Sequence, residues 1–140
     1  MEFAQIFDRV EPDAVPSGPL DVSGLPGVWI NSNPQTNGIA RMVMSESDAK
    51  LSLQVFAIGP DGLIDWGVAE VSVYAATPSS RVGAGFSCLF DFGFAESLLQ
   101  GMMMKGLLVL AELRTFKDSS KRADYFVREY FALAHEQYQG

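Results

Sequence analysis

The sequence predicts an all-β fold: an eight-stranded up-and-down antiparallel barrel preceded by an irregular N-terminal arm. Residues 82–94 alternate strictly between apolar and mostly small or polar side chains, the period of a β-strand. Strand-like segments separated by turn residues recur about every dozen residues from Gly27 onward. The chain has 140 residues, which favours one domain with a sizeable core. Eight strands suffice to enclose packed side chains or one small ligand.

Residues 1–26 form the expected arm. Within residues 2–10, four apolar side chains recur at helical spacing, so we expect one or two helical turns there. Prolines and glycines then alternate up to Gly27, which predicts an irregular segment. The arm is expected either to be disordered or to lie across the barrel as a lid, and we favour the docked arm. The barrel domain is expected to span residues 27–140.

The expected strands follow in chain order, and turn-forming residues end most of them. Asparagine, proline and glycine gather at 31–38 and 59–62, and Pro78 precedes two serines. The expected strands are 28–33, 39–45, 51–58, 66–76, 82–92, 94–104, 107–116 and 123–134.

Residues 94–104 have two interpretations. The segment AESLLQGMMM suits a short helix as well as an extended chain. We favour the strand, because it completes the barrel. The alternative is a curved α+β sheet that cups a pocket, with helices at the N-terminus or in 94–104.

The fifth expected strand carries aromatic side chains on its apolar face. Glycines on the opposite face allow a strand to bend, which a strand of this length requires. We therefore expect a strongly curved sheet around an aromatic interior. Cys88 lies on the apolar face, so we expect a buried and unreactive thiol.

Composition excludes several classes of function. The formal net charge is -7 and hydrophobic residues make up 48% of the chain. No Lys/Arg cluster exists beyond Lys121 and Arg122, so we expect no nucleic-acid or membrane partner. A single cysteine and His135 cannot assemble a Cys/His metal site, and no phosphate loop or nucleophile motif is present, so we expect no metal and no cofactor. The N-terminus has neither a basic flank nor an apolar core segment, and we expect a cytoplasmic protein.

The segment Gly27-Val28-Trp29 resembles the Gly-x-Trp opening of the calycin superfamily, which includes lipocalins and fatty-acid-binding proteins. The resemblance implies a calycin-like barrel in which Trp29 plugs the closed end. It also implies that a basic side chain near the last strand, Arg122 or Arg128, packs over the indole ring as a cation–π contact. Trp29 and Arg122 are therefore expected to be structural residues.

A longer pattern is similar to a group of small lipocalin-like proteins of poorly known function. In chain order it runs Gly-x-Trp-x-Asn, Thr-x-Gly-Ile, Asp-Trp-Gly and Phe-x-Asp-x-Ser-x-Arg-x-Asp-Tyr. The matching residues here are Gly27, Trp29, Asn31, Thr36, Gly38, Ile39, Asp65, Trp66, Gly67, Phe116, Asp118, Ser120, Arg122, Asp124 and Tyr125. Members often carry cysteines before Asp-Trp-Gly, where this chain has Gly62-Leu63-Ile64. The resemblance supplies no activity.

The apolar face of the expected barrel supplies candidate ligand contacts. Aromatic and β-branched residues would line the cavity, methionine would adapt to an irregular ligand, and a few polar groups would fix its orientation. The candidate ligand-binding residues are Arg41, Val71, Val73, Phe86, Phe90, Phe92, Met102 and Tyr125. Phe94 is a further candidate for the lining.

Three residues are candidates for acid–base chemistry. Asp65 lies beside an indole at a turn, where a buried carboxylate could act as a general base. An aspartate that caps the turn is the more common arrangement. Glu70 and Tyr74 lie on the following strand. In the 116–122 segment, turn chemistry explains Asp118 and Ser120, so we expect a structural connection between strands.

Residues 107–111 are apolar on both faces of the expected seventh strand, although a barrel strand needs only one. We therefore expect a second subunit to cover the outer face, as in a homodimer. Glu112 and Arg114 continue the Leu108 and Leu110 side of this strand. If that side faces the cavity the two charges must pair, and if it faces outward they are surface groups, which we favour.

Three functions are compatible with these observations. We favour a module that binds an apolar or aromatic small molecule in the barrel. The second is an acid–base cyclase or isomerase that acts on a polyketide- or terpenoid-like substrate. The third is a structural or interaction subunit without a ligand. A carboxylate buried in the cavity favours the enzyme, whereas an interior filled by side chains favours the third.

Overall fold

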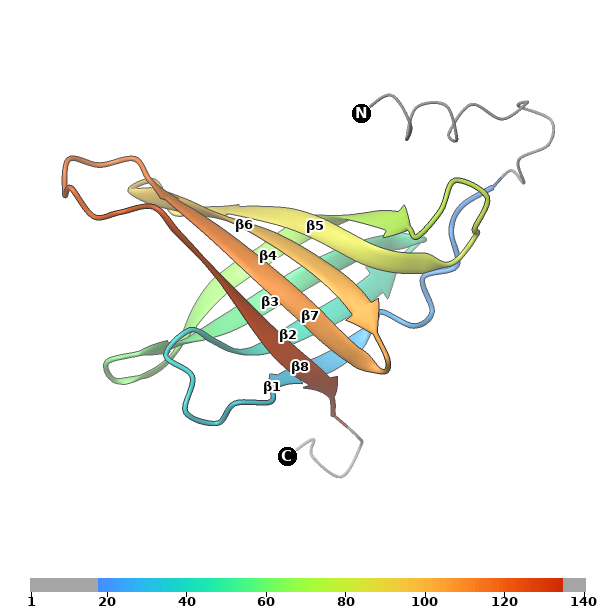
Figure 1. Ribbon diagram of the computed structural model, residues 1–140, viewed down its shortest axis with the longest axis horizontal. Coiled ribbons are helices and arrows are strands. Elements are labelled where there is room, and N and C mark those ends of the chain that lie inside the picture. The colour runs from blue at the N-terminus through green and yellow to red at the C-terminus, as the bar shows by residue number, and fades with distance from the viewer. Residues whose placement is uncertain (1–17, 135–140) are drawn as a thin grey trace.

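The computed structural model describes residues 18–134, which form a closed β-barrel with each strand antiparallel to its neighbours in chain order (Figure 1). The all-β, up-and-down prediction is confirmed. The strands are β1 (Gly27–Asn31), β2 (Ile39–Ser47), β3 (Lys50–Gly59), β4 (Gly62–Ala75), β5 (Gly83–Asp91), β6 (Ala95–Met104), β7 (Leu107–Phe116) and β8 (Tyr125–Leu133). The helix expected at 2–10 and His135 lie outside the described residues.

The segment with two interpretations is a strand. β6 pairs along its whole length with β7, from Ala95 opposite Phe116 to Met104 opposite Leu107. The α+β alternative is therefore wrong for residues 94–104. The long apolar stretch before it does not run on as one strand, because β5 ends at Asp91 and the chain turns through Gly93 at a φ of 87°.

β4 begins earlier than the sequence predicts and contains a bulge. Phe56 of β3 pairs with Asp65, whereas Val55 pairs with Gly67, so Trp66 is the extra residue. The bulge turns Trp66 towards the interior, where its ring meets Phe90.

One end of the barrel is closed by Trp29 and the segment 18–26. Trp29 is 1% exposed, and its indole Nε1 donates a 2.9 Å hydrogen bond to the carbonyl oxygen of Leu25. Backbone hydrogen bonds join Asp21 to Arg81 of the β4–β5 loop and to Gly83 at the start of β5. Residues 18–26 thus dock on the barrel, as expected for this part of the arm.

Apolar side chains fill the half of the lumen next to the closed end. These side chains come from alternate positions of every strand and are almost completely buried. The largest fully buried side chains of the protein are Trp29, Phe131, Leu25, Ile39, Met42, Leu53, Leu99, Leu108 and Val55, together with the small polar side chain of Ser97. Among them, Ile39 and Ser97 lie towards the opposite end of the barrel. The half next to the closed end therefore supplies the stability of the fold and leaves little room for a ligand.

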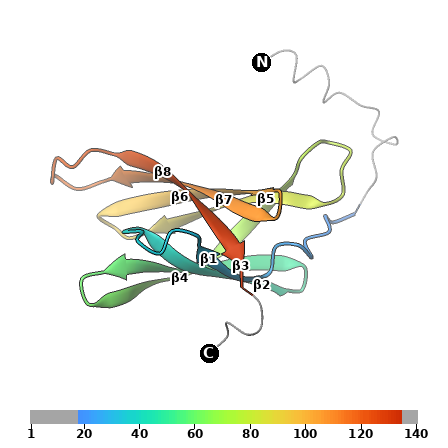
Figure 2. The same cartoon turned by 60° about the horizontal axis from the view of Figure 1, so that its bottom comes forward.

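The opposite end, which we call the mouth, is splayed. β4 pairs with β5 only through residues 72–75, and β8 pairs with β1 only through residues 131–133. The barrel consequently separates there into a β1–β4 layer and a β5–β8 layer, visible in Figure 2. The loops 32–38, 92–94 and 117–124 surround the mouth. Within residues 18–134 there is no helix long and apolar enough to cross a bilayer.

Candidate functional site

An aromatic cluster lies at the gap between β4 and β5. The ring of Trp66 meets Phe90 and Phe92 edge-to-face at centroid distances of 5.6 and 5.0 Å, and Phe94 stacks on Phe92 at 6.2 Å. These are favourable aromatic geometries. A pocket of about 320 Å³, here called the aromatic pocket, opens beside them and is lined by Ile64, Asp65, Trp66, Phe92, Phe94 and Arg114.

A buried ion pair lies at the centre of the mouth. The Glu112 side chain is 6% exposed, and its Oε2 accepts a 2.6 Å hydrogen bond from the Ser97 hydroxyl. Nη2 of Arg114 lies 3.3 Å from the same oxygen, and its Nε donates to Ser97 Oγ at 2.9 Å. The sequence-based preference for surface positions is wrong for Glu112 and Arg114, because both continue the inward face of β7 begun by Leu108.

The Arg114 guanidinium also lies over two aromatic rings. Its central carbon is 5.3 Å from the centre of Trp66 and 5.1 Å from that of Phe92. These contacts are within cation–π range. The guanidinium is therefore held by a carboxylate on one side and by rings on the other.

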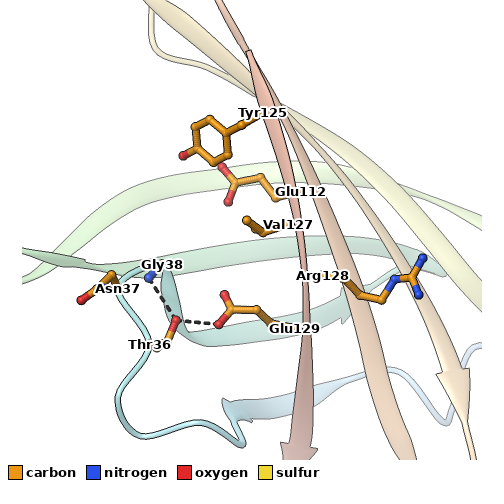
Figure 3. Close-up of a pocket in the computed structure, with 8 residues that line it drawn as sticks. All are labelled: Thr36, Asn37, Gly38, Glu112, Tyr125, Val127, Arg128 and Glu129. Atoms are coloured by element: carbon orange, nitrogen blue, oxygen red, sulfur yellow. Dashed lines mark hydrogen bonds between the residues drawn. The ribbon is translucent and has the colours of Figure 1, made fainter. Parts of the chain in front are cut away.

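A second pocket opens on the other side of this ion pair, between β8 and the 32–38 loop (Figure 3). It has a volume of about 450 Å³, and we call it the carboxylate pocket. Figure 3 shows the Tyr125 ring above the Glu112 carboxylate and Glu129 further along β8, whereas Arg128 extends away from both. Two carboxylates and a phenol thus share one concave surface.

Glu129 is held by the motif residues of the first loop. Its Oε2 accepts hydrogen bonds from Asn31 Nδ2 at 2.9 Å and from the Thr36 hydroxyl at 2.6 Å. Thr36 Oγ1 in turn accepts from the Gly38 amide at 3.0 Å, and a Cβ at Gly38 would lie 3.0 Å from Glu129 Oε1. Asn31 also donates to the carbonyl oxygen of Ile39, so the loop and the carboxylate are fixed together.

The 117–124 loop has the structural hydrogen bonds expected of it. Asp118 Oδ1 accepts from the Ser120 amide and hydroxyl, and Oδ2 pairs with Arg122 at 3.0 Å. These donors lower the pKa of the Asp118 carboxyl. The guanidinium of Arg122 lies over Phe116 and Phe94, at 4.3 and 5.5 Å from the ring centres. The expected contact of Arg122 with Trp29 is therefore wrong: Arg122 belongs to the mouth, and Trp29 to the closed end.

Five of the predicted ligand contacts face the lumen. They alternate with outward residues on β4 and β5, and Phe92 follows directly after β5. Val71, Phe86 and Phe90 are at most 8% exposed and belong to the packed core. Val73 and Phe92 are partly buried and pack against this core. Of these five, only Phe92 lines a pocket at the mouth. Tyr125, a sixth candidate, lines the carboxylate pocket.

The remaining candidates lie on the outer surface. Arg41 stacks on Phe56 outside the barrel, at 4.6 Å from the ring centre, and its buried Nε has no hydrogen-bond partner within residues 18–134. Met102 is 55% and Tyr74 54% exposed. Glu70 is also exposed.

Asp65 caps the bulge rather than entering the lumen. Its Oδ1 accepts from the Gly67 amide at 2.8 Å and its Oδ2 from Gln54 Nε2 at 3.0 Å. This is the turn-capping arrangement that the sequence favours over a catalytic base. Sequence reasoning missed Ser97 and Glu129. It weighed an inward position for Glu112 but preferred the surface, although the inward period of β7 places Glu112 two residues beyond Leu110.

Comparison with known proteins identifies no relative: no family model, no curated protein and no solved structure matches this chain.

Proposed function

We propose that this protein binds a small molecule with an apolar or aromatic body at the mouth of the barrel. The observation that carries the proposal is the aromatic pocket, in which Trp66, Phe92 and Phe94 surround a concave space next to a guanidinium. Phe94 is 45% exposed, so a ligand ring that covers it removes apolar surface from water. The pocket lies where β4 and β5 are unpaired, which leaves room for entry between the two layers.

The polar groups beside the rings suit orientation of the ligand. Ligand sites are mostly apolar with a few fixed polar groups, and Arg114 is such a group because Glu112 and Ser97 hold it. The ligand is therefore expected to lie against the rings and to direct an acceptor towards the guanidinium.

An aromatic sulfonate dye, 8-anilinonaphthalene-1-sulfonate, tests this proposal. Its fluorescence should rise on binding, and its affinity should fall about 5- to 30-fold in Trp66→Ala and in Phe92→Ala, since each removes about 1–2 kcal/mol of ring contact. Tyr74→Ala removes an exposed ring on the outer surface and should leave the affinity unchanged. Equal affinity in folded Trp66→Ala, Phe92→Ala and the parent protein would contradict the proposal.

A second candidate function is acid–base catalysis by a cyclase or isomerase. The specific observation is the buried Glu112 carboxylate, which shares the carboxylate pocket with Glu129 and Tyr125. An enzyme that consumes its ligand should retain it when the carboxylate is replaced. Native mass spectrometry of Glu112→Gln purified from cells should then show a bound small molecule that the parent protein lacks. A species retained equally by both proteins favours simple binding.

The calycin resemblance also belongs to this proposal. It is supported by the closed eight-stranded order and by Trp29 buried at the closed end. It is further supported by the convergence of Asn31, Thr36 and Gly38 on Glu129. A reducing compartment such as the cytoplasm suits the free, buried thiol of Cys88.

A further inference from the structure

The outer face of β5–β8 carries two apolar rows that run across all four strands. In the first row the register places Leu89, Leu98, Leu113 and Phe126 side by side. Phe126 is 68%, Leu89 50% and Leu113 39% exposed. Contiguous exposed apolar surface of this kind marks an interaction site.

The second row lies four residues along the strands and contains Gly85, Met102, Val109 and Tyr130. Met102 is 55% and Tyr130 47% exposed. Between the two rows lies a more polar row of Ser87, Gln100, Ala111 and Arg128. The outer face of β2–β4 differs, since Ser45, Ser52 and Glu70 form one of its rows.

The second row also contains a hollow. Gly85 has no side chain, and a concave space of about 530 Å³ opens over it between Tyr74 and Met102. At the β8 end of the same row, the Tyr130 ring projects from the surface. One face therefore carries both a hollow and a side chain able to fill it.

We propose that a second copy of this chain covers this face, with the two-fold axis parallel to the strands and between β6 and β7. This symmetry places β5 of one copy opposite β8 of the other. Each of the three rows then lies opposite the same row of the partner. Leu98 then meets the partner's Leu113, and the Tyr130 ring enters the hollow over the partner's Gly85. A two-fold axis perpendicular to the strands would instead place Arg128 opposite the partner's Arg128, and the two like charges would repel each other.

The size of the face fits such a dimer. Four strands about 4.8 Å apart and about nine residues long project roughly 500 Å². Because side chains protrude from the sheet, the accessible area of the face is larger than this projection. It approaches the area of about 800 Å² that each partner buries in a stable interface. The polar middle row also gains a partner, because Arg128 of one copy lies opposite the other copy's Ser87.

Sedimentation equilibrium of the full chain tests the proposal. The parent protein should be a dimer at micromolar concentration, and Leu113→Glu and Phe126→Glu should each raise the dimer dissociation constant at least about 100-fold. Val68→Glu places the same charge on a residue of β4 that is about as exposed as Phe126, and should leave the dimer intact. Circular dichroism establishes that each variant is folded.

A matched pair of charges tests the orientation of the two copies. Ser87→Glu should tighten the dimer and Ser87→Lys should weaken it, because both place a charge opposite the partner's Arg128, and both lose the same hydrogen bond to Tyr74. A parent protein that is monomeric, or a dimer that survives both Leu113→Glu and Phe126→Glu, would overturn the proposal. Equal effects of the two Ser87 substitutions, or a dimer weakened by Ser87→Glu and tightened by Ser87→Lys, would overturn the stated symmetry. Dye binding at the mouth is a separate measurement and is expected in either case.

Discussion

Arg114 stabilises the buried carboxylate of Glu112 at the mouth. Its guanidinium lies 3.3 Å from the Glu112 carboxylate, which is otherwise hydrogen-bonded only to Ser97 among the described contacts. Arg114→Met leaves that charge buried without its counter-ion and should lower the free energy of unfolding by about 2–4 kcal/mol, somewhat less than for a fully enclosed pair. Urea denaturation of the variant measures this loss.

The double variant Glu112→Gln with Arg114→Met is the matched control. It removes both charges and keeps the packing volume, so it should be more stable than Arg114→Met alone. If the two substitutions are additive, the ion pair contributes nothing and this account of the mouth is wrong.

Cys88 gives the structure a pH dependence at the alkaline end. Burial raises the pKa of its thiol from an ordinary value of 9.0 to about 12. The unfolded chain therefore releases this proton at lower pH than the folded protein. The stabilisation is fully present below pH 9 and is lost as the pH rises towards 12, by about 1.4 kcal/mol per pH unit.

Comparison with Cys88→Ala isolates this effect from the lysines and tyrosines that titrate in the same range. Between pH 9 and pH 10, the free energy of unfolding of the parent protein should fall by about 1 kcal/mol more than that of the variant. Identical pH profiles would show that the thiol is hydrated in the folded state.

The residues of the mouth illustrate what a sequence pattern leaves undetermined. The inward period of β7 extends from Leu108 through Glu112 to Arg114, but a charged residue in that register is equally well explained by an outward-facing strand. Only pairing with β6, which brings Ser97 opposite Arg114, decides the question. The capping role of Asp65 needs no distant contact beyond its own turn, and sequence reasoning did identify it.

At the scale of the element, the two hairpin turns at the closed end can be compared directly. The β6–β7 turn has Lys105 and Gly106 at positive φ values of 53° and 83°, and the β2–β3 turn has Asp48 and Ala49 at 53° and 65°. Two-residue turns of this conformation favour glycine at the second position, where a Cβ is strained. Ala49→Gly should therefore stabilise the protein by about 0.5–1 kcal/mol.

Thermal unfolding checks this prediction, and Ala76→Gly in the β4–β5 loop is the control. Ala76 is not among the residues with positive φ, so glycine there should be neutral or destabilising. A loss of stability in Ala49→Gly would contradict the turn geometry.

Strand order was predictable because each strand carries its own period and its own turn residues. The bounds of β6 and β7 agree with the sequence to within one residue. The early start of β4 was not predictable. The bulge at Trp66 shifts the alternation of inward and outward residues, so residues 62–65 do not continue the pattern of the strand that follows. The same bulge produces the aromatic pocket, so the site follows from a break in the pattern.

At the scale of the whole molecule, the barrel is well paired at one end and open at the other. β6 has partners on both sides along most of its length, from β5 and β7. Residues 62–71 of β4 pair only with β3 within the described chain. Closure and tight packing near Trp29 thus coexist with unpaired strand edges at the mouth.

Hydrogen exchange followed by NMR should resolve this gradient. Alternate amides of residues 62–71 point towards the gap and should exchange within minutes, whereas the amides of β6 between Ser97 and Gly101 should be protected close to the limit set by global unfolding. A ligand bound in the aromatic pocket should slow exchange in β4 next to Trp66 and leave β6 unchanged. Uniform protection along β4 in the free protein would mean that β4 and β5 pair throughout in solution, which would close the gap by which a ligand enters.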